Sequence, residues 1–240
     1  MTARYDAIAA YYDARFSDAD PVMTYLLDVL GSTAGSRVLD LACGAGRVTR
    51  ALARAGAVVT GVDLSRALLD RAEAAEAAEP LGITYTHLDA AGPAGVGEAE
   101  YDAVVCNFGL SDIDDLDGAI ANVARALCPT GRFVFSILHP CFPGGEGVSG
   151  DWPASGRYYD ERWWMADGVR STLRRQVGAN HRMLSTYVNV LRGHGLVIDE
   201  MREPDPGPKW AADGRGDSAR FPVYLVIRCA KLDVRPETGT

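Results

Sequence analysis

The stretch Val38-Leu39-Asp40-Leu41-Ala42-Cys43-Gly44-Ala45-Gly46-Arg47 carries the clearest signal in this chain. Its apolar start is typical of a buried strand, and its small residues allow a tight turn that brings a ligand close to the backbone. Residues 48–55 read as a helix, and the amides that open such a helix bind polar ligands. Taken alone the unit is a weak indication, because many nucleotide-binding turns and plain structural turns share it.

The rest of the chain alternates between apolar runs rich in Val and Ile and stretches with helical spacing. This alternation predicts an α/β fold with a doubly wound, mostly parallel sheet of seven strands. Such sheets bind ligands at the carboxyl ends of their strands, near the switch in strand order. Two helices are expected in the first thirty residues and others at 48–55, 65–80, 115–127 and 184–191. The strands are expected at 38–41, 57–62, 83–88, 101–106, 132–138, 196–201 and 221–229.

The 240 residues are expected to form a single domain, because no linker or internal repeat divides them. Within it, residues 1–35 are interpreted as a helical cap, 36–138 as the ligand-binding core, and 184–230 as the final helix and strands. Residues 139–183 are rich in Gly, Pro and aromatic residues and show no clear period. An irregular segment of this length is usually functional, and we expect it to be a lid over the substrate.

Composition narrows the class of partner. The 24 Lys and Arg against 32 Asp and Glu give a net charge of −8, which is unfavourable for binding nucleic acid or an anionic membrane. No segment reads as a signal peptide, and no apolar run approaches the roughly 20 residues that span a bilayer. The five cysteines are scattered without a C-x-x-C pair, so a disulfide frame or metal site is not expected. We therefore expect a cytoplasmic protein with a small-molecule partner; its oligomeric state is not encoded in any pattern.

Two carboxylates follow neighbouring strands of the predicted sheet. Asp63 ends the second strand, about twenty residues after the glycine turn, where an acid accepts hydrogen bonds from both ribose hydroxyls. Asp89 follows the third strand and suits an adenine amino group. Each also reads as a cap or turn residue, although Ser65 is the better helix cap. Three features in register at adjacent strand ends favour a nucleoside site.

Two residues discriminate between nucleoside ligands. A dinucleotide fingerprint would have Gly at position 49, where this chain has Thr49. Asp40, just upstream of the turn, adds little to phosphate binding, whereas a ligand with an ammonium and a sulfonium group tolerates it. These features favour S-adenosylmethionine over NAD.

With these motifs the chain resembles the class I S-adenosylmethionine-dependent methyltransferases that act on small molecules. The resemblance covers roughly residues 1–140 and the last two strands. It is carried by residues 5–13, 38–47, 63, 88–90, 101–107 and 127–132. Ala42 departs from the Gly that many members carry. The resemblance implies that S-adenosylmethionine is the cofactor, that Tyr12 or Arg47 lies near its carboxylate, and that residues 5–13 fold over it. The implied cofactor-binding residues are Tyr12, Asp40, Ala42, Gly44, Arg47, Asp63, Leu64, Asp89, Ala90 and Asn107.

The expected reaction is transfer of a methyl group to an oxygen or nitrogen of a small molecule. Because the cofactor brings its own leaving group, alignment of nucleophile and methyl matters more than a strong base. His139, directly after the fifth strand, is the candidate general base. The alternative is a histidine that only braces the lid through hydrogen bonds. The weaker candidates are Asp112, His181 and three tyrosines, Tyr11, Tyr158 and Tyr159.

The side chains of the 139–183 segment allow two interpretations each. Its aromatic residues, such as Trp152, Trp163 and Trp164, either wall a substrate pocket or form the core of a small subdomain. Its arginines either form a solvated surface or bind an anionic substrate. They are Arg157, Arg162, Arg170, Arg174, Arg175 and Arg182.

Other functions remain open at this level. The same fold can bind the cofactor and promote cyclisation or decarboxylation without methyl transfer, or bind a partner without catalysis. RNA or DNA methylation is disfavoured by the acidic charge. It is also disfavoured by the sequence Asn107-Phe108-Gly109-Leu110 in place of a Pro-Pro-aromatic motif. Methylation of a protein has no feature in its support.

Overall fold

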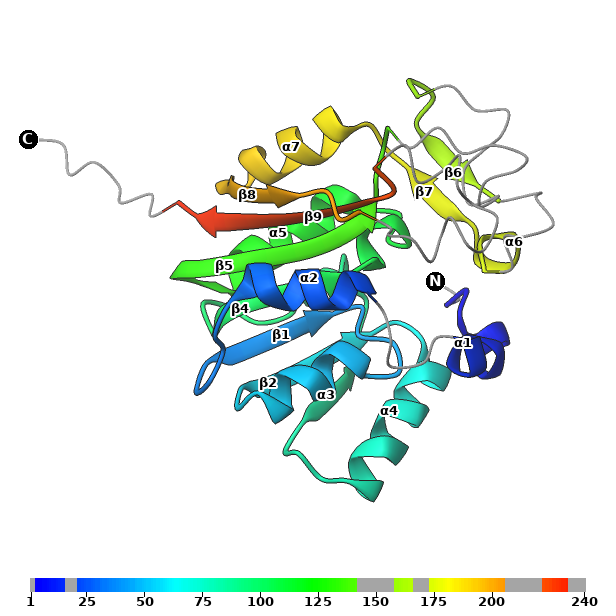
Figure 1. The fold of residues 1–240 in the computed structure, drawn as a ribbon, viewed down its shortest axis with the longest axis vertical. Coiled ribbons are helices and arrows are strands. Elements are labelled where there is room, and N and C mark those ends of the chain that lie inside the picture. Colours follow the sequence, from blue (N-terminus) through cyan, green and yellow to red (C-terminus); the bar gives the residue numbers. More distant parts are fainter. Residues whose placement is uncertain (1–2, 16–20, 142–157, 166–172, 206–221, 233–240) are drawn as a thin grey trace, which may run out of the picture.

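The computed structural model describes residues 3–15, 21–141, 158–165, 173–205 and 222–232 (Figure 1). At its centre is a seven-stranded sheet with the order β3-β2-β1-β4-β5-β9-β8. The chain adds β2 and β3 on one side of β1 and β4 on the other, so the strand order switches between β1 and β4. In this sheet β1 to β5 and β8 run in one direction and β9, between β5 and β8, runs in the other, which confirms the predicted doubly wound, mostly parallel fold. The strands are β1 (Arg37–Leu41), β2 (Val58–Asp63), β3 (Thr84–His87), β4 (Tyr101–Asn107), β5 (Leu127–Leu138), β8 (Leu196–Arg202) and β9 (Tyr224–Lys231).

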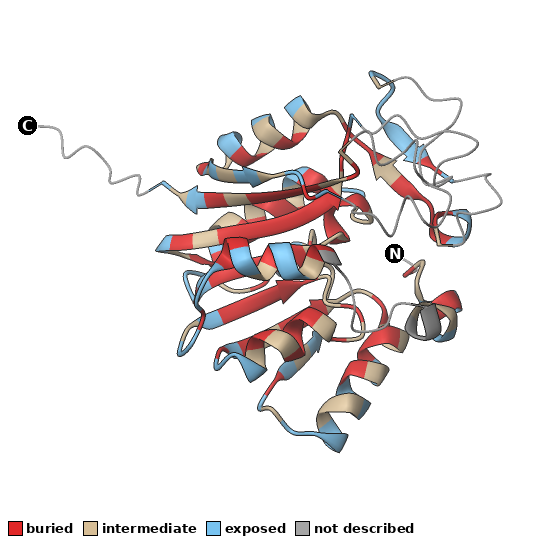
Figure 2. Ribbon diagram, viewed as in Figure 1, coloured by how far each residue is buried: buried red, intermediate tan, exposed pale blue. Residues whose placement is uncertain are grey.

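Helices cover both faces of the sheet, and the alternation of side chains along each strand explains why. Val38 of β1 packs in a cluster with residues of α2 (Pro21–Leu30) and α3 (Arg47–Arg54). Leu39 points to the opposite face, into a cluster with α5 (Leu116–Ala126) and α7 (Leu184–Gly193). Strands buried on both sides read as continuous apolar runs, which is the pattern seen in the sequence. Figure 2 shows this core as buried residues along the central strands.

Local signals place the ends of several helices. Ser65 caps α4 (Arg66–Ala78) by accepting a hydrogen bond from the Leu68 amide at 3.2 Å, as expected. Asp115 caps α5 in the same way through the Gly118 amide. Residues 129–131, between the helix expected at 115–127 and the strand expected at 132–138, lie inside β5. There the register shifts so that Tyr101 faces Leu127 but Ala103 already faces Arg132, and the extra residues form an irregularity in the strand.

The insertion after β5 contains regular structure that the sequence pattern did not indicate. β6 (Arg162–Trp164) pairs antiparallel with β7 (Ala179–His181), and α6 (Arg174–Val177) precedes β7. Trp164 is buried against Ala179, as expected for the core of a small subdomain, whereas Trp163 is half exposed. Trp152 lies outside the described residues. In Figure 1 these elements lie beside α1 (Ala9–Arg15), on the side of the molecule toward which β1 points.

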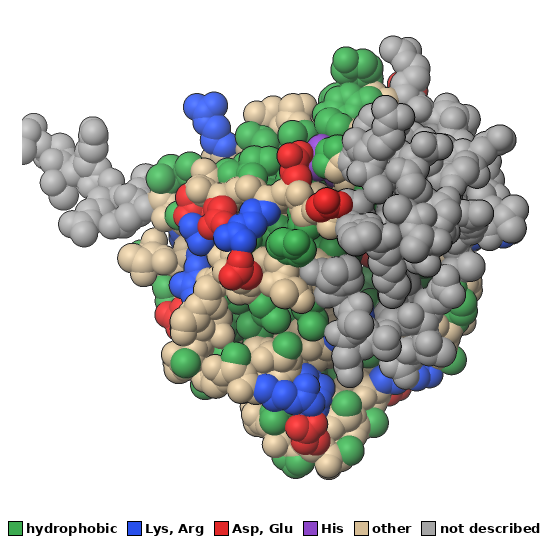
Figure 3. Space-filling model, in the orientation of Figure 1, with side chains coloured by type: hydrophobic (Ala, Val, Ile, Leu, Met, Phe, Trp, Pro, Cys, Tyr) green, Lys and Arg blue, Asp and Glu red, His purple; other side chains and the backbone are tan. Residues whose placement is uncertain are grey.

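The surface carries both signs of charge in close proximity. Figure 3 shows basic and acidic side chains next to one another over α2, β8 and β9. The contacts there include ion pairs of Arg202 with Glu200 and of Arg228 with Asp199. Among the described residues, no helix combines the length and apolar character needed to cross a membrane.

Candidate functional site

The glycine loop joins β1 to α3 in a conformation that only small residues tolerate well. Ala42, Gly44 and Gly46 have φ of 57°, 56° and 81°, in the left-handed region. A Cβ at Gly46 would lie 2.4 Å from the Tyr85 hydroxyl oxygen, so the close packing of β3 requires glycine there. At Ala42 the left-handed backbone explains why many members of the resembled family carry Gly, since Ala costs on the order of 1–2 kcal/mol in this conformation.

Asp63 lies at the tip of β2 and touches the glycine loop. Its Oδ2 accepts a hydrogen bond from the Gly44 amide at 2.8 Å, and its Oδ1 accepts one from the Ser65 amide at 2.7 Å. Burial raises the pKa of this carboxyl, against the effect of the two amides, which lower it. A carboxylate oxygen accepts about two hydrogen bonds, so each oxygen retains capacity for a ligand hydroxyl. The sequence and the structure thus place an acceptor pair where a ribose diol is expected.

The N-terminal segment, residues 3–15, lies against the same loop. The Tyr12 ring is 3.9 Å from the position of a Cβ on Gly44, and the Arg47 guanidinium donates to the Tyr12 hydroxyl at 3.3 Å. Burial raises the pKa of Tyr12, so its hydroxyl stays protonated. On the other side of the loop, Ser65 donates to the Asp6 carboxylate at 2.6 Å. Asp6 is a site residue that sequence reasoning did not single out, although it stands within the quoted 5–13 motif.

Asp40 does not face the loop directly. Its side chain lies on the α3 side of β1, 1% exposed, and accepts a hydrogen bond from the Thr49 hydroxyl at 2.6 Å. Burial raises the pKa of Asp40 to about 7. Asp40 therefore supports the loop through α3, and direct contact with a cofactor is not part of this arrangement. Thr49, singled out only because it is not Gly, has a structural role as the partner of Asp40.

The predicted adenine edge is held by backbone contacts. Asp89 accepts from the Ala91 amide at 3.0 Å, which is the turn geometry given above as its alternative role. The Ala90 carbonyl accepts from the Asn122 side chain at 2.8 Å, and the Leu64 carbonyl accepts from His87 at 2.9 Å. These contacts fix the strand ends on which the adenine prediction depends.

The turn after β4 packs on the glycine loop at the switch in strand order. The Asn107 side-chain oxygen accepts from Ser136 at 2.6 Å. Phe108, like Ala42, is a non-glycine residue with positive φ (62°), and a Cβ on Gly109 would lie 2.5 Å from the Ala42 Cβ. Two left-handed non-glycine residues thus lie just beyond the ends of adjacent strands. Strain of this kind persists at functional sites.

His139 is not placed as a general base. It is 4% exposed, its Nε2–H donates to Glu203 at 2.9 Å, and its Nδ1 accepts from the Cys141 amide at 3.1 Å. With both ring nitrogens engaged, neither accepts a proton from a substrate in this arrangement. Burial lowers the pKa of His139, although Glu203 acts in the opposite direction. The structure favours the bracing role, because the end of β5 is tied to the segment after β8.

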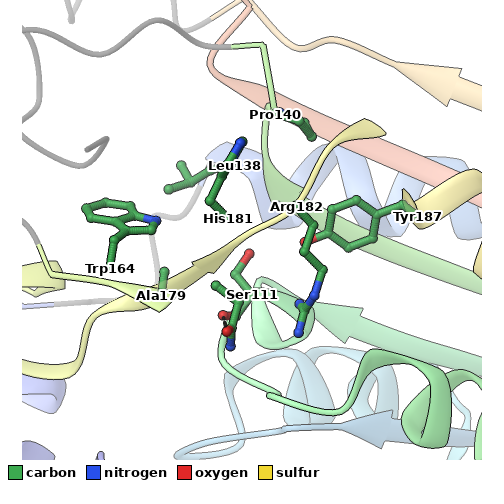
Figure 4. Close-up of a pocket in the computed structure, with 9 residues that line it drawn as sticks. Ser111, Leu138, Pro140, Trp164, Ala179, His181, Arg182 and Tyr187 are labelled. Carbon is green, nitrogen blue, oxygen red and sulfur yellow. Dashed lines mark hydrogen bonds between the residues drawn. The ribbon is translucent and has the colours of Figure 1, made fainter. Parts of the chain in front are cut away.

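A small pocket lies between the end of β5, the turn after β4 and the β6–β7 pair (Figure 4). Its volume is about 20 Å³, room for about one water. Trp164 and Ala179 lie at one end of the view and Arg182 and Tyr187 at the other, with Ser111 between them. The pocket therefore combines an aromatic wall with hydroxyl groups.

Two of the six arginines of the insertion are buried and engaged by the protein itself. Arg182 donates to the carbonyls of Leu110, Ile113 and Asp114 at 2.6–2.9 Å. Arg174 pairs with Asp112 and donates to the Gly178 carbonyl. The hypothesis that these two bind an anionic substrate is therefore not supported. Arg162 and Arg175 are exposed, and Arg157 and Arg170 lie outside the described residues.

Comparison with known proteins finds similarity to methyltransferases. The model of the methyltransferase domain family matches residues 39–135. A ubiquinone biosynthesis O-methyltransferase from Alkalilimnicola ehrlichii is 32% identical over 144 residues, 57% of this chain and 58% of that protein. An S-adenosylmethionine-dependent methyltransferase from Mesorhizobium loti is 27% identical with a TM-score of 0.70, over 90% of this chain and 98% of that one. These findings support a class I S-adenosylmethionine-dependent methyltransferase.

The comparisons also give the extent of these matches and a neighbour with a different activity in its name. The chain spans less than two thirds of the length of the curated relative. The [4+2]-cyclase SpnF shares the fold, with a TM-score of 0.63, 19% identity, and coverage of 92% of this chain and 84% of that one. The fold is therefore also found in a protein named for cyclisation.

The donor set fits the family's cofactor. S-adenosylmethionine presents a diol, an adenine, a carboxylate, an ammonium and a sulfonium group. The tip of β2 presents the half-engaged Asp63 carboxylate, and the start of α3 presents the Arg47 guanidinium. Between them lies Gly44, where a Cβ would meet only Leu68 and Tyr12, both beyond 3.7 Å. S-adenosylmethionine requires a backbone surface with a carboxylate on one side for its diol and a cation on the other for its carboxylate.

Proposed function

We propose that this protein transfers a methyl group from S-adenosylmethionine to an oxygen or nitrogen of a small-molecule acceptor. The observation that carries the proposal is the position of Asp63 at the tip of β2, next to the strand where the order switches, with its carboxylate bound by the Gly44 and Ser65 amides. The cofactor, when bound, supplies an electrophilic methyl group and its own leaving group. The similarity of this chain to a ubiquinone biosynthesis O-methyltransferase and its acidic composition support a small-molecule acceptor and a cytoplasmic location, without a nucleic-acid partner.

The roles of the residues follow from their contacts. Asp63 accepts from the ribose hydroxyls, and Asp89 with Ala90 forms the adenine edge. Arg47 binds the carboxylate of the methionine moiety, and Tyr12 covers it. The backbone of Ala42, Gly44 and Asn107, with Leu64 beside Asp63, completes the surface.

The acceptor side requires alignment more than a base. The pocket near Ser111, Trp164 and Tyr187 borders the end of β4, and we assign it to one end of the acceptor. The described residues of the 139–183 segment that line this pocket belong to this side, and the four parts assigned in the sequence act as one domain. Holding the acceptor in line and excluding water supplies roughly 7–11 kcal/mol, which is sufficient without His139.

Calorimetry with S-adenosylhomocysteine tests the cofactor site. The wild type is expected to bind, and Asp63→Ala is expected to weaken binding by on the order of 100-fold, because two ligand hydroxyls lose a charged acceptor. Asp70→Asn is the matched control, since Asp70 is an exposed acid of α4 that pairs with Arg66. Wild-type affinity in Asp63→Ala would contradict the assignment.

Product analysis tests the reaction. A panel of phenols, catechols and amines is incubated with S-adenosylmethionine, and S-adenosylhomocysteine is quantified alongside each product. Methyl transfer requires equal amounts of methylated product and S-adenosylhomocysteine. Conversion of a substrate with no S-adenosylhomocysteine formed would instead support cyclisation or decarboxylation.

A further inference from the structure

Asp112, three residues after Gly109, is contacted by two elements that are far apart in the sequence. The Tyr5 hydroxyl donates to its Oδ2 at 2.9 Å, and the Arg174 guanidinium donates to its Oδ1. Arg174 is 5% exposed and also lies 3.5 Å from the Tyr5 hydroxyl. One carboxylate therefore joins the N-terminal segment to the insertion.

Asp114 repeats the arrangement two residues later. Its carboxylate accepts from Arg4 at 2.8 Å and from the Asn180 side chain at 2.9 Å. The Arg4 guanidinium also lies over the Trp163 ring, 5.3 Å from its centroid. Each acid of this turn thus bridges one residue of the N-terminal segment and one of the insertion. Two independent bridges with the same topology define a junction, formed by Arg4, Tyr5, Asp112, Asp114, Arg174 and Asn180.

The junction lies between the two halves of the proposed site. On one side, Tyr5 packs edge-on against Tyr12, with ring centroids 5.5 Å apart, and Tyr12 covers the glycine loop. On the other, Asn180 and the adjacent His181 line the pocket assigned to the acceptor. Residues 3–15 are therefore held from both sides, by Ser65 near the cofactor and by Asp112 near the acceptor.

Charge makes Asp112 the sensitive member of this junction. Arg174 is buried, and Asp112 is the acid with which it forms an ion pair. Burial and the nearby Asp112 carboxylate both raise the pKa of Tyr5, so Tyr5 stays a hydrogen-bond donor. Removal of the charge takes this carboxylate from a buried guanidinium, and the contacts on both sides of Asp112 weaken together.

We propose that Asp112 is a positioning residue that couples the N-terminal segment over the cofactor to the insertion beside the acceptor. The inference rests on the proposed function and assigns a link between its two binding events. Because coupling between two sites is reciprocal, an occupied cofactor site orders the acceptor side, and an acceptor slows release of the cofactor.

The test uses S-adenosylhomocysteine alone, so it does not depend on the acceptor. Its dissociation rate is measured by stopped flow, and hydrogen exchange of the amides of residues 179–181 is measured with and without it. In the wild type, S-adenosylhomocysteine is expected to increase the protection of these amides. A purely structural role of Asp112 would change their protection in both states equally, and only coupling changes the difference.

In Asp112→Asn, dissociation is expected to accelerate on the order of 10-fold, and the ligand-induced protection of residues 179–181 is expected to disappear. Tyr5→Phe, which removes one hydroxyl, carries the same test if Asp112→Asn does not fold. The double variant is expected to add little to the single ones, because both break one network. Asp117→Asn is the control, since Asp117 is an exposed acid of α5 that pairs with His194 outside the junction.

Wild-type dissociation together with wild-type ligand-induced protection in both Asp112→Asn and Tyr5→Phe would overturn the coupling while leaving the proposed function intact. Absence of S-adenosylhomocysteine binding to the wild type would overturn the proposed function and, with it, the coupling. The two failures are therefore distinguished by the first measurement.

Discussion

Asp40 makes the stability of this protein depend on pH in a direction opposite to that of most acids. Its pKa is raised from 3.8 to about 7, chiefly by burial, and the Thr49 hydroxyl only partly offsets this. Between pH 4 and 7 the folded protein therefore retains a proton that the unfolded chain has lost. The free energy of unfolding falls as pH rises through this window, because the folded state binds more protons.

The perturbation is Asp40→Asn, which cannot titrate. From pH 5 to pH 8 the two pKa values predict that the wild type loses about 2–3 kcal/mol relative to the variant, at 1.36 kcal/mol per unit. The amide group of Asn lacks a partner at this position and adds a cost that is independent of pH. The quantity to measure is therefore how the difference in unfolding free energy between the wild type and Asp40→Asn changes with pH. The value of this difference at a single pH is not informative.

Urea unfolding followed by circular dichroism, at pH 5, 6, 7 and 8, gives this quantity. Thr49→Val removes the hydroxyl that lowers the pKa of Asp40 and is expected to move the window to higher pH, whereas Thr49→Ser keeps the hydroxyl and the window. Parallel stability curves for the wild type and Asp40→Asn would show that Asp40 is already ionised in the folded protein and would refute the reasoning.

Further predictions concern the end of β5 and the two turns that meet at Gly109 and Ala42. His139→Ala is expected to lower turnover less than 10-fold and to lower Tm. Because burial keeps the folded ring neutral, the wild type loses stability as pH falls below about 6.5, and the variant is expected not to show this loss. A loss of turnover above 100-fold with unchanged Tm would instead support His139 as the general base. Ala42→Gly is expected to stabilise by about 1 kcal/mol in urea unfolding by relieving a left-handed residue, and destabilisation would contradict this. Gly109→Ala is expected to lower Tm because its Cβ meets that of Ala42, and adding Ala42→Gly should recover part of the loss; additive effects of the two changes would exclude that contact.

The sequence predicted those parts of the site that depend on local pattern. β1, the glycine loop and the cap at Ser65 follow from residues within a few positions of one another. Asp63 followed from its place at a strand end, since parallel strands end at one edge of the sheet. Its contacts with Gly44 and Ser65 are the local consequence of that placement.

What the sequence could not provide depends on distant partners. The sequence suggested His139 as a base because its hydrogen-bond partner, Glu203, is 64 residues away and does not show in the local pattern. The sequence also suggested an anion site at Arg174 and Arg182. Their partners in the structure, Asp112 and carbonyls of the turn after β4, are distant in sequence, so the burial of these arginines could not be foreseen. β6 and β7 have three residues each, too few to show a period, and they pair across the segment that contains α6.

The Ser65 hydroxyl donates its single proton to the Asp6 carboxylate, and its oxygen accepts a hydrogen bond from the Leu68 amide. If residues 3–15 swing outward, water takes the place of Asp6, and the exchange costs about 1 kcal/mol net. Helix α4 keeps its first turn throughout, since the oxygen remains bound to Leu68. The Ser65 contact is therefore a small part of the cost of uncovering this tip of the sheet, because the contacts of Arg4 with Asp114 and of Tyr5 with Asp112 must break as well.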